Sequence, residues 1–298
     1  MPMMGDQVGL SIDRVILATD FSPVSEAATS YAKGIAKHFA SSLTVAHVID
    51  LSVSTRSEQA VVGLPIDETR RNDNEKLENL LDSLAEDGVR ATAQSLEARN
   101  PATAIVGLSQ QLRADLIVLG THSRHGLSKA ILGSCAEGVI RHATCPVITI
   151  GPKVKPRSSQ DDFAFKTIVF ATDFDSDAAE KASVALTFAQ DSAAKIYLCH
   201  TVERSGENVS ERLRLQQEFE SALQKLIPQS AYDWCTPECV VEQGEAAAHT
   251  LAFSKQVKAD LIVIGARRSS SWFTHLVEGA VEHVLADAEC PVMTICTT

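Results

Sequence analysis

The chain carries three short sequence blocks twice, in the same order, and this repeat constrains its fold more than any other feature. The recurring pairs are VILATDF (15–21) with IVFATDF (168–174), ADLIVLG (114–120) with ADLIVIG (259–265), and CPVITI (145–150) with CPVMTI (290–295). In both copies 25 positions separate the glycine of the second block from the cysteine of the third. Matching order and spacing indicate a duplication, so the fold must be built from two related units.

Each copy has the pattern of alternating buried strands and helices. The opening apolar runs are short and β-branched without alternation, which is typical of strands buried on both faces of a parallel sheet. Ser22-Pro23 predicts a helix start, with a capping hydroxyl before proline, as does Asn100 before Pro101, and Asp175 is expected to cap in the second copy. Further helices are expected near 68–86, 101–113 and 133–143, and strands near 43–49, 91–97, 116–120 and 146–150. A charged helix near 208–227 is expected to face the sheet with Leu213, Phe219, Leu223 and Leu226.

This alternation predicts an α/β fold of two repeated doubly wound parallel-sheet domains, Rossmann-like and with about five strands each. We expect the first domain to span residues 1–151 and the second 166–298. Residues 152–165 between them hold two prolines, two lysines and a polar run, and are expected to form a linker.

Composition excludes several classes of function. A net charge of −11 argues against a nucleic-acid-binding face, because contact with phosphate backbones depends on clustered Lys and Arg. The apolar runs are far shorter than the roughly 20 residues that cross a bilayer. The start lacks the pattern of a secretory signal, and seven cysteines do not suggest a disulfide framework. The sequence therefore predicts a cytoplasmic protein with no membrane and no nucleic-acid partner.

Residues that could bind a ligand follow the first and fourth predicted strands. In an open α/β sheet the ligand crevice lies beyond the carboxyl ends of the strands, at the switch point. The first strand ends at Thr19-Asp20, and the fourth ends at Gly120, before a loop that is closed by Gly133. Backbone N–H groups at a helix start, approached across glycines, suit phosphate oxygens. The pattern alone leaves open that the glycines serve turn geometry and that Asp20 caps the first helix.

Taken together, the Ala-Thr-Asp-Phe-Ser opening, the strand ending in His47-Val48, the glycine-bounded loop and the Cys-Pro-Val strand resemble the universal stress protein family. The family fold is similar to that of adenine nucleotide alpha hydrolases, and its ATP-binding members carry a loop of the form Gly, two residues, Gly, nine residues, Gly, Ser or Thr. The resemblance implies that Gly120, Gly133 and Ser134 form the phosphate loop and that Asp20 binds the ribose or adenine side. It also implies a backbone contact from Val48 to adenine. ATP, with or without Mg²⁺, is the expected ligand, and the expected nucleotide-binding residues are Ala18, Thr19, Asp20, Val48, Gly120, His122, Ser123, Arg124, Gly133 and Ser134.

Two departures from the family loop qualify this expectation. Ser123 stands at the middle glycine, and if that position needs positive φ, serine costs about 1 kcal/mol. In the second copy, Glu278-Gly279 replaces Gly133-Ser134. A carboxylate in that position should repel a triphosphate, so we expect the second copy to be a degenerate one that serves pairing or regulation.

The last strand of each copy is short and apolar. In the resembled family such edge strands pair across a two-fold axis, which removes an exposed sheet edge. We therefore expect an intramolecular domain pair, while a further homodimer and protein partners stay open. The residues expected to pair are Val147, Ile148, Thr149, Ile150, Val292, Met293, Thr294 and Ile295.

The leading hypothesis is a stress-response protein that binds ATP or a related adenine nucleotide in its first domain. The alternative is a protein-interaction module of the same fold that binds no nucleotide, and a third hypothesis is an ATP-dependent enzyme. The sequence shows no nucleophile–base pattern, so no catalytic residue is predicted, and slow ATP hydrolysis stays open. The pairs Cys235/Cys239 and His122/His125 lack further ligands at metal-site spacing, so no metal is predicted. His47 and His200 lie at equivalent strand ends, where packing or hydrogen bonding to the backbone explains them best.

Overall fold

The computed structural model describes residues 11–52, 66–121, 132–157, 163–202, 209–266 and 280–296. One ten-stranded sheet runs through both copies in the order β3-β2-β1-β4-β5-β10-β9-β6-β7-β8. The first copy supplies β1 (Arg14–Thr19), β2 (Ser42–Asp50), β3 (Ala91–Ala98), β4 (Leu116–Gly120) and β5 (Val147–Ile150). The second supplies β6 (Thr167–Ala171), β7 (Lys195–Val202), β8 (Thr236–Gln243), β9 (Leu261–Ala266) and β10 (Val292–Cys296). Within each copy all pairings are parallel, so the predicted doubly wound fold is confirmed.

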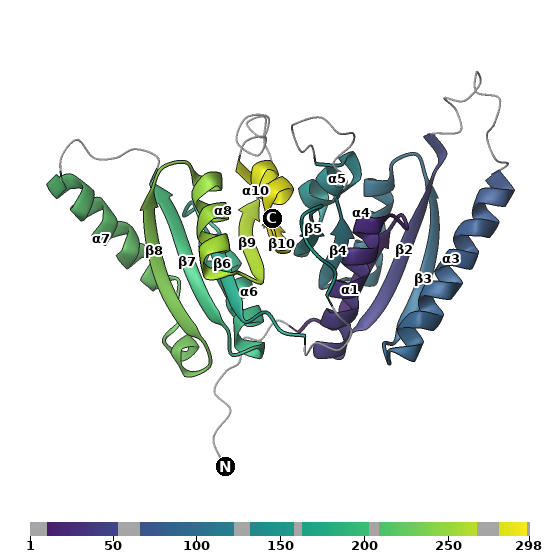
Figure 1. Ribbon diagram of the computed structural model, residues 1–298, viewed down its shortest axis with the longest axis horizontal. Coiled ribbons are helices and arrows are strands. Elements are labelled where there is room, and N and C mark those ends of the chain that lie inside the picture. Colours follow the sequence, from purple (N-terminus) through teal and green to yellow (C-terminus); the bar gives the residue numbers. More distant parts are fainter. Residues whose placement is uncertain are drawn as a thin grey trace, which may run out of the picture.

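The helices cover both faces of this sheet (Figure 1). Those of the first copy are α1 (Pro23–His38), α3 (Ile66–Glu86), α4 (Pro101–Leu112) and α5 (Ser134–His142). Those of the second are α6 (Ala178–Asp191), α7 (Val209–Lys225), the 3-10 helix η1 (Gln229–Asp233), α8 (Ala246–Val257) and α10 (Glu282–Asp287). Buried side chains of α1, α3, α6 and α7 share one apolar core, and those of α4, α5, α8 and α10 share the other. Alternate strand residues supply the two cores, as in Val15 and Leu17 against Ile16 and Ala18.

The two copies join through β5 and β10, which lie side by side at the centre of Figure 1. They pair antiparallel, with Ile148 opposite Met293, Thr149 opposite Val292 and Val147 opposite Thr294. Ile148 and Met293 occupy equivalent positions of the repeat, so a pseudo-two-fold axis passes between them. The Thr294 hydroxyl also donates to the Val147 carbonyl at 3.3 Å. The pairing removes two sheet edges that would otherwise stay open to other chains.

The described part of the segment between the copies packs onto α1. The ring of Phe163 lies so close to Gly34 that an added Cβ would be 2.1 Å from its Cδ2. The Arg157 guanidinium carbon lies over this ring, 5.0 Å from its centroid, and the Arg157 backbone N–H donates to the Ser30 hydroxyl at 3.0 Å. Phe163 is 9% exposed and Phe165 is 2% exposed. Aromatic burial therefore fixes the path between the two copies.

Several local predictions of the sequence are confirmed. Ser22 is the N-cap of α1 and accepts a hydrogen bond from the Ser25 N–H, with Pro23 in the first turn. Asn100 caps α4 in the same way, accepting from the Thr103 N–H at 3.2 Å. None of the helices in the described ranges is long and apolar enough to cross a membrane.

Candidate functional site

The carboxyl ends of β1 and β4 form the switch point of the first copy. The two strands are neighbours in the sheet, with Ala18 opposite Leu119. From β1 the chain proceeds through β2 to β3 on one side, and from β4 it proceeds to β5 on the other. The helices that follow β1 and β4 consequently cover opposite faces, and in open α/β sheets this edge is where the ligand crevice lies.

A tight turn holds Asp20 at this edge. Phe21 adopts φ 59°, a left-handed conformation that is costly for a non-glycine residue, and its N–H donates to the Thr19 hydroxyl at 3.1 Å. Oδ1 of Asp20 accepts from the Ser22 N–H at 3.1 Å and from the Ser25 hydroxyl at 2.5 Å. The residue is nevertheless exposed, so the turn fixes a solvent-facing carboxylate at the end of β1.

Two histidines at equivalent positions secure the first strand of each copy. Nδ1 of His47 lies 2.9 Å from the Thr19 carbonyl oxygen, and Nδ1 of His200 lies 2.9 Å from that of Thr172. A carbonyl can only accept, so Nδ1 carries the proton in both rings. The sequence-based interpretation of these histidines as partners of the backbone is confirmed. Val48, the next residue after His47, is half-buried against the core on the α4/α5 side.

On the β4 side of the crevice, close packing requires glycine. A Cβ added to Gly120 would lie 3.0 Å from the backbone carbon and oxygen of Val24, because the first turn of α1 crosses there. Gly133 is the N-cap of α5 and makes no side-chain capping bond, while Ser134 is exposed. Among the described residues, no side chain caps the first N–H groups of α5, and uncapped N–H groups at a helix start suit an anionic ligand.

Cys135, in the first turn of α5, shows that these elements converge. Its thiol pKa is raised to about 11, first by burial and then by the carboxylates of Asp20 and Asp50. Asp20 follows β1 and Asp50 ends β2, so two strand ends act electrostatically on the start of α5. A raised pKa means that the thiol is protonated at neutral pH.

The structure thus gathers most of the residues expected to bind nucleotide along one edge of the sheet. Ala18, Thr19, Asp20 and Val48 lie at the ends of β1 and β2, Gly120 ends β4, and Gly133 and Ser134 begin α5. His122, Ser123 and Arg124 lie outside the described residues. No group of three or more His, Cys, Asp or Glu side chains that could hold a metal ion occurs in the described ranges.

The family model described as the universal stress protein family matches residues 11–151 and again residues 164–295. The chain therefore belongs to the universal stress protein family. A universal stress protein of Methanocaldococcus jannaschii is 34% identical over 145 residues, which cover 46% of this chain and 81% of that protein. Among solved structures, a universal stress protein from Archaeoglobus fulgidus DSM 4304 has a TM-score of 0.72 at 20% identity and covers 97% of this chain and 98% of that chain. A protein of unknown function from Pseudomonas aeruginosa PAO1 has a TM-score of 0.67 at 17% identity, with 97% and 94% covered. These two structural likenesses show that the tandem fold as a whole is shared.

The second universal stress protein unit differs at the same edge. Asp175 was expected to cap its first helix, and this prediction is wrong: α6 begins at Ala178, and the N-cap residue is Asp177, whose side chain makes no capping bond to the helix. The Asp175 carboxylate instead pairs with the Lys181 ammonium, and the two side chains are only 8% and 3% exposed. The reason is tertiary, because Lys181 is buried against the end of β9, where a Cβ on Gly265 would lie 3.1 Å from its Nζ. Leaving a buried cation without a counter-charge costs more free energy than leaving a helix end without a side-chain cap.

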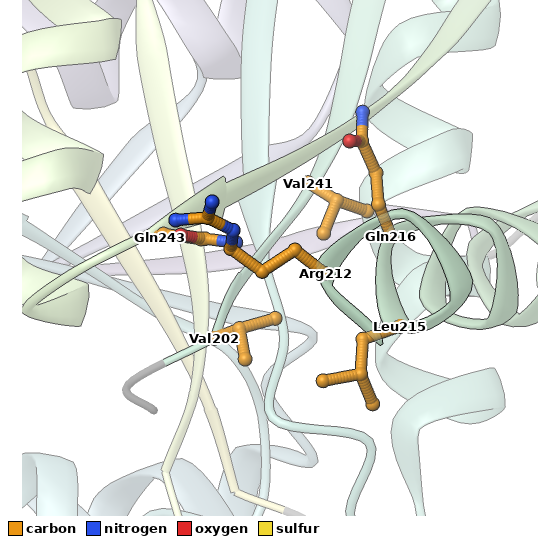
Figure 2. A pocket seen from close by; sticks show the side chains of 6 residues that line it. All are labelled: Val202, Arg212, Leu215, Gln216, Val241 and Gln243. Carbon is orange, nitrogen blue, oxygen red and sulfur yellow. The ribbon is translucent and has the colours of Figure 1, made fainter. Parts of the chain in front are cut away.

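A shallow hollow opens in the second unit between α7 and the ends of β7 and β8. Figure 2 shows that Arg212, Leu215 and Gln216 reach it from α7 and that Val202, Val241 and Gln243 line its floor. It lies beside β7, one strand away from the β6–β9 switch point. Leu213, expected to face the sheet, is 55% exposed, so that prediction is wrong. The inward-facing stripe of α7 consists of the half-buried Leu215 and Phe219 and the buried Leu223 at four-residue spacing, which turns Leu213 away. The hollow was not predicted from the sequence, although that spacing was visible there.

Proposed function

We propose that the first unit binds ATP or a related adenine nucleotide at the crevice between β1 and β4. One observation carries the proposal: the exposed carboxylate of Asp20 and the start of α5, which no described side chain caps, meet at the same edge of the sheet. Carboxylates accept hydrogen bonds from sugar hydroxyls and amino groups, and helix starts bind phosphate. These are the two ends of a nucleotide.

Each part of the proposed ligand has a matching group in this chain. Asp20 would accept from the ribose or the adenine amino group, and the backbone of Val48 would contact the base. The N–H groups at Gly133 and Ser134 would bind phosphate oxygens. His122, Ser123 and Arg124, from the loop outside the described residues, complete the proposed set by resemblance to the family. Any Mg²⁺ would be bound mainly through the phosphates of the nucleotide, since the described residues offer no cluster of ligands for it.

The proposal assigns binding to the first unit alone and describes a stress-response protein that works in the cytoplasm. In the second unit, Asp175 and Ala178 stand at the positions of Ser22 and Ser25, and the buried Lys181–Asp175 pair lies at the switch point. It would serve mainly to cover the edge of β5 through β10. The described cysteines are all free thiols, in keeping with a reducing compartment. The proposal includes no hydrolytic step, and it assigns the Asp20 carboxylate to the ribose or adenine.

Calorimetric titration with ATP and Mg²⁺ tests this proposal. We expect one binding site per chain, and we expect it to be lost in Gly133→Glu, which copies Glu278 of the second unit. A carboxylate at a helix start is favourable to the helix, so this variant should lose binding while keeping its stability. Gln110→Glu on α4 adds the same charge on an exposed surface and should bind as the original chain does. Absence of heat and of thermal stabilisation at millimolar ATP would refute nucleotide binding.

A further inference from the structure

A chain of polar and aromatic contacts links Asp20 to helix α3. On the far side of the His47 ring, Nε2 lies 3.2 Å from Oδ2 of Asp73, on α3. Oδ1 of Asp73 accepts from the Lys76 ammonium at 3.1 Å, and that ammonium lies 5.2 Å from the centroid of the Phe21 ring. Phe21 in turn packs on His47 with ring centroids 4.8 Å apart. We call His47, Asp73, Lys76 and Phe21 the α3 clamp.

The α3 clamp holds both chain neighbours of Asp20. Thr19 is bound through its carbonyl to His47, and Phe21 is enclosed by His47 and Lys76 in its left-handed conformation. A residue between two fixed neighbours has little freedom to change its backbone direction. The position of the Asp20 carboxylate therefore depends on α3, although no described α3 side chain is required to touch a ligand.

In the second unit an aromatic side chain makes the equivalent contacts, in place of the charged side chains of the first. Phe219 on α7 packs on His200 with ring centroids 4.4 Å apart and stacks on Phe174 at 5.8 Å. It lies four residues before the buried Leu223, just as Asp73 lies four residues before the buried Leu77. Asp73 and Phe219 thus occupy corresponding positions, and the first unit has a carboxylate where the second has a phenyl ring.

The carboxylate of the first unit is not explained by a gain in stability over the phenyl ring of the second. The side chains of His47 and Asp73 are only 9% and 13% exposed, so both are largely removed from water. A buried polar network is often no more stabilising than well-packed apolar side chains of similar volume. The aromatic version in the second unit shows that this fold can secure the same turn without charge. The charged version therefore calls for a reason other than stability.

We propose that the α3 clamp is a positioning network for the nucleotide site of the first unit and that it makes α3 responsive to the ligand. The inference rests on the proposed function. Asp73 and Lys76 act through His47 and Phe21 on the turn that presents Asp20. Ligand bound to Asp20 in turn stabilises the clamp and, through it, α3. In the second unit, α7 has no such connection to a ligand.

The test compares Asp73→Phe, which installs the aromatic residue of the second unit, with Asp73→Asn, which keeps a hydrogen-bonding partner for Nε2 of His47. We expect Asp73→Phe to raise the Kd for ATP about tenfold, the scale on which outer-shell partners tune a site, with little change in Tm. Asp73→Asn should recover most of the affinity. Phe219→Ala removes the corresponding contact in the second unit, and it should leave the Kd unchanged even though it lowers Tm.

Hydrogen exchange of the unaltered chain gives a second readout that needs no variant. Saturating ATP should slow amide exchange in α3, while exchange in α7 stays as it is without ligand. If the chain binds ATP but Asp73→Phe binds equally well, or α3 exchange does not respond, the clamp proposal is wrong and nucleotide binding stands. If the unaltered chain binds no ATP, the proposed function fails and the clamp proposal fails with it.

Discussion

Gly34 lies within α1, and its replacement by alanine has two opposite effects on the free energy of unfolding, one from helix propensity and one from packing. An added Cβ would lie 2.1 Å from Cδ2 and 2.6 Å from Cγ of the Phe163 ring, so ring or helix must move. Overpacking of this kind costs about 1–3 kcal/mol, whereas alanine gains only about 0.5–1 kcal/mol over glycine within a helix. We therefore expect Gly34→Ala to lower the free energy of unfolding by about 1–2 kcal/mol.

The sign of this effect should reverse when the ring is removed. Phe163→Ala by itself should cost about 3–5 kcal/mol, because the side chain is 9% exposed and belongs to the core. In that background, Gly34→Ala meets no ring and should stabilise by about 0.5–1 kcal/mol. Gly107 supplies the matched control: it lies within α4, and nothing is found within 4 Å of its added Cβ. Gly107→Ala should stabilise by a similar amount in both backgrounds.

The stability of all these variants is measured by urea unfolding, followed by far-ultraviolet circular dichroism. The slope of the unfolding free energy against urea concentration must be equal among the variants before their free energies are compared. The reasoning depends on the docking of Phe163 against α1. If Gly34→Ala stabilises the unaltered chain as much as Gly107→Ala does, then Phe163 does not occupy that place in solution. Phe163→Ala would then be expected to have little effect on the path between the two units.

Three further predictions concern buried ionisable groups. Lys181→Met should cost about 3–5 kcal/mol in urea unfolding, because it leaves Asp175 buried without its cation, while loss of the exposed Lys153 from its pair should cost less than about 1 kcal/mol. Asp20→Asn removes a carboxylate that raises the Cys135 pKa, so the pKa should fall from about 11 and alkylation of that thiol at mildly alkaline pH, followed by mass spectrometry, should become faster. Burial raises the pKa of several thiols from 9.0 to about 12, so these thiols lose their protons at lower pH in the unfolded chain than in the folded one. The urea midpoint should therefore fall as pH rises above 9, and an unchanged midpoint would contradict this.

Much of the fold could be predicted because its signals are local. The repeat with its apolar runs predicted the strand pattern of both copies, and the caps at Ser22 and Asn100 followed from side chains that bind N–H groups three residues away. Strand ends at a switch point also identified Asp20 and Gly120 as residues to inspect. These inferences need only spacing along the chain and the topology of a parallel sheet.

What the sequence could not predict depends on contacts between distant residues. Asp175 has the form of a helix cap, and only the burial of Lys181 against β9 explains why its carboxylate turns inward. His47 was assigned to the backbone, but its second partner on α3 depends on the rotation of that helix against the sheet. The contact of Phe163 with Gly34 joins residues far apart in sequence, and no local pattern encodes it.

The two units hold the end of their first strand by different chemistry, and the difference bears on which unit can accept an anion. In the second unit a cation beside the switch-point glycine is already neutralised, because Lys181 is buried with Asp175. An anionic ligand there would have to displace a carboxylate that is covalently part of the chain and therefore present at high effective concentration. In the first unit the corresponding positions are Ala28 and Ser22, so this ion pair has no equivalent there. Restoring an anion site in the second unit would thus require removal of Asp175 as well as a change in the loop. A loop graft that leaves the ion pair in place should remain unable to bind nucleotide.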